Sequence, residues 1–332
     1  MKPLNSFREL LNQLTEAETK FINKATARVQ DLEANSSGKW GKLGEIAIFL
    51  SGWKAKERPL ITKPLLAIFA GKHAVIENNL AGKNNNFTES LVKLYIKGST
   101  ATNQICVSHN LSLKIFDLAL KYPADDFLMQ ESMTEKNCAA TMAFGMEVTA
   151  DNVDLLCLSS LGWENNFIAS TIAFALYGGK AEDWLVMTQQ DTKEILSYKA
   201  ELIEQAVNLH KQYLTDSFEI LKYFGGREFA AMTGAILAAR MNKIPVILDN
   251  FTAVVAAAIL HSYDSKALDH CLIASLPNEK IANKLAEKLN KKPLLNLNIT
   301  SEEGMSAALA ANIVKDAALI FHNSEYDQLD NS

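Results

Sequence analysis

Two adjacent glutamates, Glu302 and Glu303, stand where an apolar run gives way to a small-residue helix. The stretch reads PLLNLNITSEEGMSAALAA over residues 293–311. A carboxylate at a helix start gains about 0.3–1 kcal/mol from the helix dipole and needs no further role. A carboxylate held by a rigid loop, with its pKa adjusted by burial, can instead act as a general base. These residues alone leave both interpretations of Glu303 open.

Apolar runs that alternate with helical segments set the fold class. Stretches that predict strands occur at residues 64–71, 112–120, 153–162, 244–250 and 270–277, and the first of them is a continuous apolar run. Strands of a parallel sheet that is covered on both faces have this continuous apolar pattern. Most of the segments between them carry apolar residues at helical spacing. The alternation predicts an α/β fold in which helices flank a parallel sheet.

The two ends of the sequence are helical and fall outside this alternation. Helical periodicity covers residues 6–33 and 41–53, and a small-residue helix is predicted at 306–323. We expect these segments to pair as a small helical subdomain beside the sheet. The predicted organisation is residues 1–60 as the N-terminal helical part, 61–300 as the α/β domain and 301–332 as the C-terminal helix that returns to the small subdomain.

Polar residues follow several predicted strands at the point where each strand ends. In parallel α/β sheets, ligands bind at loops beyond the carboxyl ends of the strands, so these residues predict a binding site at one rim. They are His73 after the first run, Ser160, Gly162, Asn165 and Asn166 after the third, Asp249 after the fourth, and Glu302 with Glu303 near the C-terminus.

Each rim residue also has a purely structural interpretation. His73 is either a hydrogen-bonded structural residue or part of the site. Asp249 either caps the helix that follows it or binds a ribose. Gly162, Asn165 and Asn166 are either loop and capping residues or binding residues.

Composition limits the kinds of partner, the location and the cysteine chemistry that we expect. The 332 residues are 48% hydrophobic and 21% charged, with a net charge of −5 and no basic block, so we expect no nucleic-acid partner. No signal peptide and no apolar run of about 18 residues stands out, so we expect a cytoplasmic protein without a membrane span. The four cysteines are widely spaced, which predicts buried free thiols and neither a zinc site nor a disulfide framework.

Six stretches resemble one enzyme family in order and spacing. They are KLGEIAIFLSGW, LLAIFAGKHAV, IKGSTATNQI, FGGREFAAMTGAILAAR, IPVILDNFTAVVAAAIL and PLLNLNITSEEGMSAALA. The last two resemble the patterns iPVllDGfi..aAAl and PLLdL.mrLGEGtGAalA. The family is the nicotinate-nucleotide:dimethylbenzimidazole phosphoribosyltransferases of cobamide lower-ligand synthesis, and the likeness runs from about Gly41 to Ala318.

The resemblance implies a three-layer, Rossmann-like α/β fold, a small helical part built from both ends of the chain, and a homodimer. It also implies a reaction in which the phosphoribosyl group of nicotinate mononucleotide moves to a benzimidazole-type base. The products would be an α-riboside phosphate and nicotinate, and neither a metal nor a cofactor would take part.

The same resemblance assigns roles to single residues. The glutamate of the LGEGtG pattern falls on Glu303, which implies a general base. Glu302 takes the place of a glycine, as a solvated or capping neighbour whose charge would raise the pKa of Glu303. Lys199 resembles a lysine on a family helix, so it is either a phosphate contact or a surface lysine.

The phosphate loop is where the sequence departs from the family. The pattern GEMGIGNTT lines up with SSLGWENNF at residues 159–167, where Gly162 and Asn165 match and Ser160 replaces an acid. Glycines let backbone N–H groups approach a phosphate closely, and larger residues obstruct that approach. Two hypotheses follow. The first is an active phosphoribosyltransferase, and the alternative is a non-catalytic paralogue that acts as a small-molecule binder or as the silent subunit of a hetero-oligomer.

Overall fold

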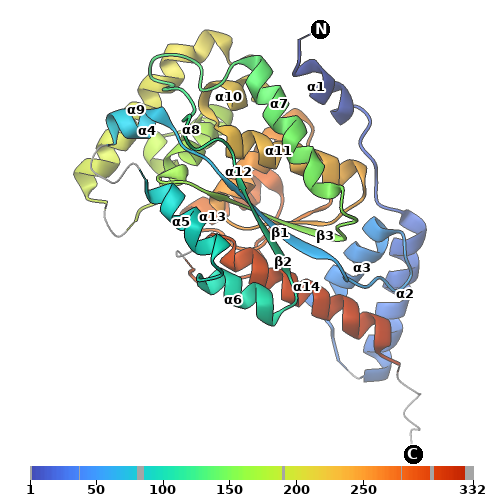
Figure 1. Ribbon diagram of the computed structural model, residues 1–332. Coiled ribbons are helices and arrows are strands. Elements are labelled where there is room, and N and C mark those ends of the chain that lie inside the picture. The colour runs from blue at the N-terminus through green and yellow to red at the C-terminus, as the bar shows by residue number, and fades with distance from the viewer. Residues whose placement is uncertain are drawn as a thin grey trace, which may run out of the picture.

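A parallel sheet crosses the middle of the molecule (Figure 1). The computed structural model describes residues 2–36, 38–80, 86–188, 191–277, 279–299 and 303–325. Within them the sheet has five strands in the order β2-β1-β3-β4-β5, and every neighbouring pair is parallel. The strands are β1 (Pro64–Ala70), β2 (Ser112–Asp117), β3 (Leu155–Leu161), β4 (Val246–Leu248) and β5 (Cys271–Ile273). The predicted α/β fold with a parallel sheet is confirmed.

Side chains of alternate strand residues enter two different hydrophobic cores. In β1, Leu65, Ala67 and Phe69 belong to the larger core, whereas Leu66 and Ile68 belong to the core on the opposite face. Successive side chains of a strand point to opposite faces, so a strand covered by helices on both sides is apolar throughout. All seven residues of β1 and of β3 are buried, which explains their continuous apolar pattern.

Two helical layers cover the sheet (Figure 1). The layer on the larger core comprises α7 (Glu135–Met146), α8 (Asn165–Tyr177), α9 (Lys193–His210), α10 (Ser217–Phe224), α11 (Arg227–Met241) and α12 (Phe251–Tyr263). The opposite layer comprises α3 (Lys42–Lys54), α5 (Phe87–Ile96), α6 (Ala101–Ser108) and α14 (Met305–Asn323). The remaining helices are α1 (Asn5–Leu11), α2 (Thr19–Ser36), α4 (Ala74–Asn79) and α13 (Glu279–Leu289), with short 3₁₀ turns at Glu147–Thr149, Ala181–Trp184 and Lys211–Tyr213.

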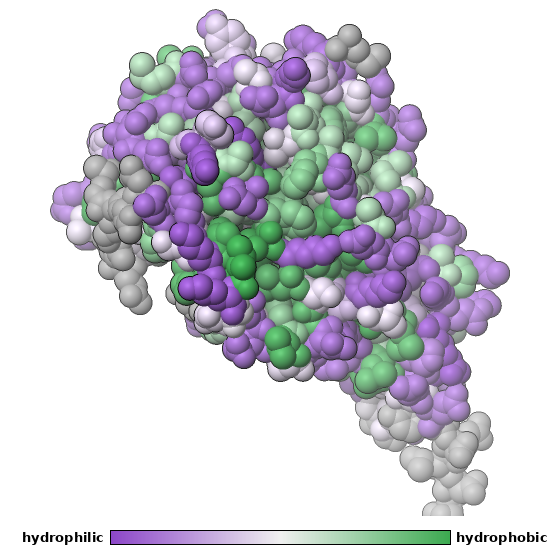
Figure 2. Space-filling model, viewed as in Figure 1, coloured by the Kyte–Doolittle hydropathy of each residue, from purple (hydrophilic) through white to green (hydrophobic). Residues whose placement is uncertain are grey.

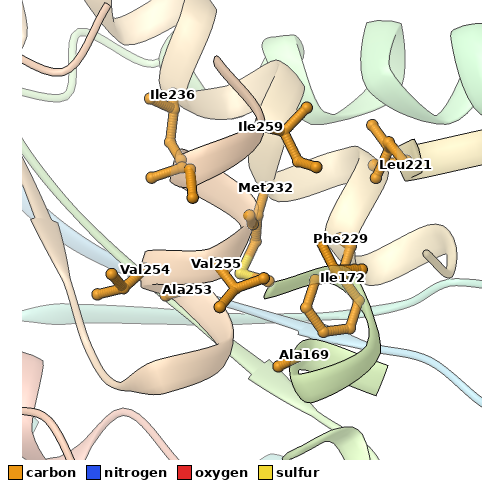
Figure 3. Close-up of a cluster of buried hydrophobic side chains, with 14 of the residues drawn as sticks. Ala169, Ile172, Leu221, Phe229, Met232, Ile236, Ala253, Val254, Val255 and Ile259 are labelled. Atoms are coloured by element: carbon orange, nitrogen blue, oxygen red, sulfur yellow. The ribbon is translucent and has the colours of Figure 1, made fainter. Parts of the chain in front are cut away.

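The larger core is built around α11. Figure 3 shows Phe229 and Met232 from this helix meeting Val255 and Ile259 from α12 and Ile172 from α8. All five side chains are buried. Because α11 and α12 are buried on nearly every side, apolar residues occupy most of their circumference and the helices show little amphipathic pattern, although Glu228 and Arg240 of α11 are buried as well.

The chain ends meet in a small cluster beside the sheet. Ala25 and Val29 of α2 pack with Ala47 of α3 and Phe321 of α14. The guanidinium of Arg28 donates to the carbonyl of Phe321 at 3.2 Å. In contrast, α1 packs its buried face into the larger core, away from α2 and α3. Among the helices of the described ranges, none is long and apolar enough to cross a membrane.

Helices α7 and α11 cross at two glycines. A Cβ atom built on Gly145 of α7 would lie 1.9 Å from the carbonyl oxygen of Ala231, and one on Gly234 of α11 would lie 2.0 Å from that of Met142. Each glycine therefore packs against the backbone of the other helix, where no side chain fits.

We predict that Gly145→Ala destabilises the protein by about 1–3 kcal/mol, because the added methyl group overpacks a backbone contact that cannot yield. This loss outweighs the gain of about 1 kcal/mol that alanine brings to a helix. Urea unfolding measures the difference. Ala140→Gly, on the exposed side of α7, calibrates the propensity alone. A Gly145→Ala variant as stable as the parent or more so would contradict the close crossing.

Candidate active site

A cavity of about 640 Å³ lies beyond the carboxyl ends of β3, β4 and β5. Its wall is formed by residues 162–166 after β3, 186–188, 249–251 after β4 and 275–277 after β5, together with Ile299, Glu303 and Ser306. This is the rim at which a parallel sheet binds its ligands. The volume is in the range of small-molecule sites, which are about 300–1,000 Å³.

Asp249 is a buried carboxylate that joins β4 to α14. Its Oδ2 accepts hydrogen bonds from Ser159 Oγ and from the backbone N–H of Gly304, both at 2.8 Å. Its Oδ1 accepts from the backbone N–H of Ala307 at 2.7 Å. These N–H groups belong to the start of α14, where the backbone donors have no partner within the helix. Asp249 therefore caps a helix, as one interpretation predicted, but that helix is α14 and not the one that follows it.

Glu303 is held in place through its own backbone. Its carbonyl oxygen accepts from Tyr95 Oη at 2.7 Å and from Thr102 Oγ1 at 3.2 Å. The next residue, Gly304, has φ of 83°, and a Cβ atom there would lie 2.8 Å from Leu66 Cδ2. Glycine alone adopts this left-handed conformation without strain. The turn fixes where the side chain of Glu303 enters the cavity wall.

The carboxyl group of Glu303 is partly exposed to this cavity and has a strongly raised pKa. Burial is the main cause, the neighbouring charge of Asp249 adds to it, and the pKa rises to about 8. Hydrogen bonds from Asn250 and Ser159 act in the opposite direction. Asn250 Nδ2 lies 2.5 Å from Glu303 Oε2.

The two neighbouring carboxyl groups have unequal hydrogen bonding. Burial raises the pKa of Asp249 as well, against hydrogen bonds from Ala307, Gly304 and Ser159 that lower it. Glu303 has fewer donors to stabilise its anion. We therefore infer that Asp249 keeps the negative charge and that Glu303 is the member of the pair that takes up and releases a proton.

The loop after β3 contributes the opposite wall. Gly162, Asn165 and Asn166 line the cavity as the rim prediction placed them, whereas Ser160 lies beneath the wall, buried and bonded to Thr252 Oγ1 at 2.9 Å. A Cβ atom on Gly162 would lie 2.2 Å from Asn165 Oδ1, so this glycine makes room for the asparagine side chain. The side chains of this loop line the cavity and do not fill it.

Two predicted substrate contacts are engaged elsewhere. His73 is buried, and its Nε2 lies 2.6 Å from Glu228 Oε1, outside the cavity wall. Lys199 is also buried, and its Nζ donates at 2.8 Å to both Glu164 Oε2 and Asp191 Oδ1.

The pKa of Lys199 reflects these two ion pairs. Burial would lower it, but the hydrogen bonds to Asp191 and Glu164 outweigh burial and raise it. The structure thus makes Lys199 a buried support of the cavity wall rather than a surface lysine or a lining residue. Glu302, the remaining predicted residue, lies outside the described residues.

Asn250, Ser159 and Thr252 are site residues that the sequence prediction did not include. Asn250 lines the cavity and reaches the carboxyl group of Glu303. Its position directly after Asp249, at the end of an apolar run, was a signal for it. Ser159 and Thr252 lie inside apolar segments, and no local pattern marks them. Within the described residues, no group of three metal-ligating side chains comes together.

The chain matches a family model described as "Phosphoribosyltransferase" over residues 14–328. A nicotinate-nucleotide–dimethylbenzimidazole phosphoribosyltransferase of Brucella anthropi is 45% identical over 320 residues, which cover 96% of this chain and 93% of the relative. The protein of the same name from Allorhizobium ampelinum is 45% identical over 316 residues, covering 95% and 92%. A crystal structure of CobT from Thermus thermophilus superimposes with a TM-score of 0.82 at 22% identity, covering 94% of this chain and 99% of that chain.

The cavity beyond a parallel α/β sheet and the match over most of the chain define the class of protein: it is a phosphoribosyltransferase. More narrowly, the chain belongs to the family of nicotinate-nucleotide–dimethylbenzimidazole phosphoribosyltransferases. The likeness to the Thermus thermophilus crystal structure shows the fold of this chain. The sequence identity to the two relatives, over nearly the whole length of each chain, shows its family.

We predict that Glu303→Gln is stabilising relative to the parent at alkaline pH. In the folded protein the pKa is about 8, against an ordinary value of 4.5, so the unfolded chain releases this proton first as pH rises. The parent therefore loses stability between these pH values, with a slope of at most about 1.4 kcal/mol per pH unit because one proton is involved.

Thermal unfolding of parent and variant from pH 5 to pH 9 measures this difference. The advantage of Glu303→Gln grows up to about pH 8 and then levels off. Glu182→Gln on the exposed surface is the control and shows no such trend. Parallel curves for Glu303→Gln and the parent would show that the carboxyl group keeps its ordinary pKa.

Proposed function

We propose that this phosphoribosyltransferase moves the phosphoribosyl group of nicotinate mononucleotide to dimethylbenzimidazole, with Glu303 as the general base. The activity rests on membership of the family, and the role of Glu303 rests on one observation. That observation is the place of the Glu303 carboxyl group in the wall of a cavity of about 640 Å³ at the ligand-binding rim of the sheet, where burial raises its pKa to about 8.

The chemistry requires a base at this place. One nitrogen of the benzimidazole attacks the anomeric carbon of the ribose while the other nitrogen gives its proton to the Glu303 carboxylate. The bond from the anomeric carbon to the nicotinate nitrogen breaks, and its electron pair neutralises the positive ring nitrogen. The acceptor approaches opposite the leaving group, so the β-configured donor gives an α-riboside. Positioning of the two flat rings supplies much of the remaining rate.

The start of α8 is the part of the wall that suits the phosphate. Helix N-termini attract anions through their dipole and their unpaired N–H groups. Asn165 and Asn166 begin this helix and line the cavity. The Lys199 ion pair offsets the charge of Glu164, which also lines the wall and would otherwise repel a phosphate. Lys199 therefore acts on the cavity through Glu164 and does not line the cavity itself.

The enzyme is favoured over the non-catalytic alternative. The relatives named as transferases are 44–45% identical over more than nine-tenths of both chains. In addition, a carboxyl group kept at a raised pKa costs stability at neutral pH, and catalysis is a reason to keep it.

The homodimer implied by the resemblance remains a proposal. Figure 2 shows apolar side chains gathered in the middle of the face formed by β2 between α5 and α7. Leu94 and Ile96 of α5 and Phe144 of α7 are among the exposed large apolar residues. Oligomer interfaces cover apolar surfaces of this kind. Light scattering of the purified chain determines the assembly.

We predict that the purified protein converts nicotinate mononucleotide and dimethylbenzimidazole into an α-riboside phosphate and nicotinate, detected by chromatography. The base works in its ionised form, so kcat/KM falls as pH drops below about 8, the pKa of Glu303. Glu303→Gln lowers kcat by about 100-fold or more, in the range that a lost general base costs.

Glu182→Gln changes an exposed glutamate that is not among the residues of the cavity wall, so it is the matched control and keeps full activity. Absence of product with the parent protein across pH 6–10 would favour the binding protein over the enzyme. Undiminished turnover by Glu303→Gln would leave the activity intact but remove Glu303 from the mechanism.

A further inference from the structure

A chain of side-chain hydrogen bonds runs beneath the cavity wall and ends at Glu303. Asn165 Nδ2 donates to Ser160 Oγ at 3.2 Å, and Ser160 Oγ donates to Thr252 Oγ1 at 2.9 Å. Thr252 Oγ1 donates to Asn250 Oδ1 at 2.7 Å. Asn250 Nδ2 then donates to Glu303 Oε2 at 2.5 Å. The hydrogen bonds link three separate segments, which are the end of β3 with the start of α8, the start of α12 and the turn before α14.

The direction of these bonds is fixed by a backbone group. The backbone N–H of Thr252 also lies 3.2 Å from Asn250 Oδ1, and an N–H group can only donate. The amide oxygen of Asn250 must therefore face Thr252, which leaves its NH₂ group to face Glu303. The Thr252 hydroxyl gives its proton to the same oxygen, so it accepts from Ser160, whose oxygen in turn accepts from Asn165.

Asn250 is itself held on rigid elements. It is the N-cap residue of α12, with extended backbone angles, and it directly follows the end of β4. Its amide cannot turn over without placing an NH₂ group against the Thr252 N–H. Glu303 therefore faces a donor whose position and identity are both set before any substrate binds.

We propose that Asn250 is a positioning residue for the general base. Its amide, locked by Thr252, engages one oxygen of the Glu303 carboxyl group and leaves the other for the proton of the acceptor. This inference rests on the proposed role of Glu303. It adds a residue that touches the base and does not itself take part in proton transfer.

The same contact favours the ionised form that the base needs. A donor N–H stabilises a carboxylate more than a carboxylic acid. The ionisable group that acts on Glu303 is the carboxyl group of Asp249, which disfavours ionisation. Glu164 is the other carboxyl group in the described cavity wall, and it is paired with Lys199. Asn250 thus opposes both burial and the charge of Asp249.

Three variants separate positioning from simple helix capping. Asn250→Asp keeps an oxygen that can cap α12 but replaces the donor with a third carboxyl group. Asn250→Ala removes both the cap and the donor. Thr252→Val keeps the backbone N–H that fixes the orientation of the amide but removes the second donor to its oxygen, the Thr252 hydroxyl. Thr134→Ala is the control, because Thr134 caps α7 through its side chain and is exposed, away from the cavity.

The first experiment is the pH profile of kcat/KM with nicotinate mononucleotide and dimethylbenzimidazole. For Asn250→Asp and Asn250→Ala we expect the acidic limb to move up by one pH unit or more, which means at least a tenfold loss of kcat/KM at pH 7. Most of that loss recovers at pH 10. Thr252→Val shifts the limb in the same direction by less. Thr134→Ala lowers the melting temperature but leaves the limb in place.

The second experiment needs no turnover. The protein is labelled with carboxyl-¹³C glutamate, and the Glu303 resonance is identified by its loss in Glu303→Gln. We expect its titration midpoint to rise in Asn250→Asp and Asn250→Ala. A midpoint within 0.2 pH unit of the parent in both variants would overturn the proposal, whatever the assay shows. A midpoint that moves while Glu303→Gln stays active would instead reject the base and keep the positioning contact.

Discussion

The site depends on one buried carboxylate, that of Asp249. Removing a carboxylate from water is costly unless donors surround it, and Asp249 has the hydroxyl of Ser159 and backbone N–H groups at the start of α14. The same bonds satisfy donors that a buried helix start would leave unpaired. Strand β3, strand β4 and helix α14 are thereby joined at one point. Glu303 immediately precedes this helix, so its position is a consequence of that junction.

The two carboxyl groups at this junction, those of Asp249 and Glu303, differ in how readily they ionise. Asp249 has several donors and keeps its charge, and that charge makes ionisation of Glu303 harder. Burial, together with that charge, raises the pKa of Glu303 to about 8, where a carboxyl group can exchange a proton with a nitrogen heterocycle. Paired carboxyl groups with different environments divide their roles in this way in many active sites. Asp249 thus adds to the effect of burial on Glu303, the residue that we propose as the base.

The sheet and the location of the site could be predicted from the sequence, because both follow from local patterns. Continuous apolar runs mark the buried strands, and polar residues at their ends mark the rim. The partners of those residues could not be predicted, since they lie far apart along the chain. Asp249 bonds to Ala307, 58 residues away, and His73 bonds to Glu228, 155 residues away. The run that begins at Pro293 forms only a single parallel bridge, although its composition resembles that of a strand.

In the segment aligned with the family's phosphate loop, the loss of a glycine from the sequence did not predict the backbone conformation correctly. Glu164 stands where the quoted pattern has its third glycine, and it adopts φ of 58°, a conformation that glycine accepts freely. A loss of glycine in the sequence therefore did not mean a loss of the turn. The ion pair with Lys199 holds the side chain that glycine would lack. Position 250 is likewise a glycine in the quoted pattern, and its side chain here reaches the base.

Helix α14 runs from the cavity wall to the contact between the two chain ends. Its 19 residues form a rod of roughly 28 Å, with Glu303 just before one end and the carbonyls that Arg28 binds at the other. The contact between the two chain ends and the turn that carries Glu303 therefore lie at opposite ends of one continuous helix, so α14 is held at its start by Asp249 and at its end by Arg28.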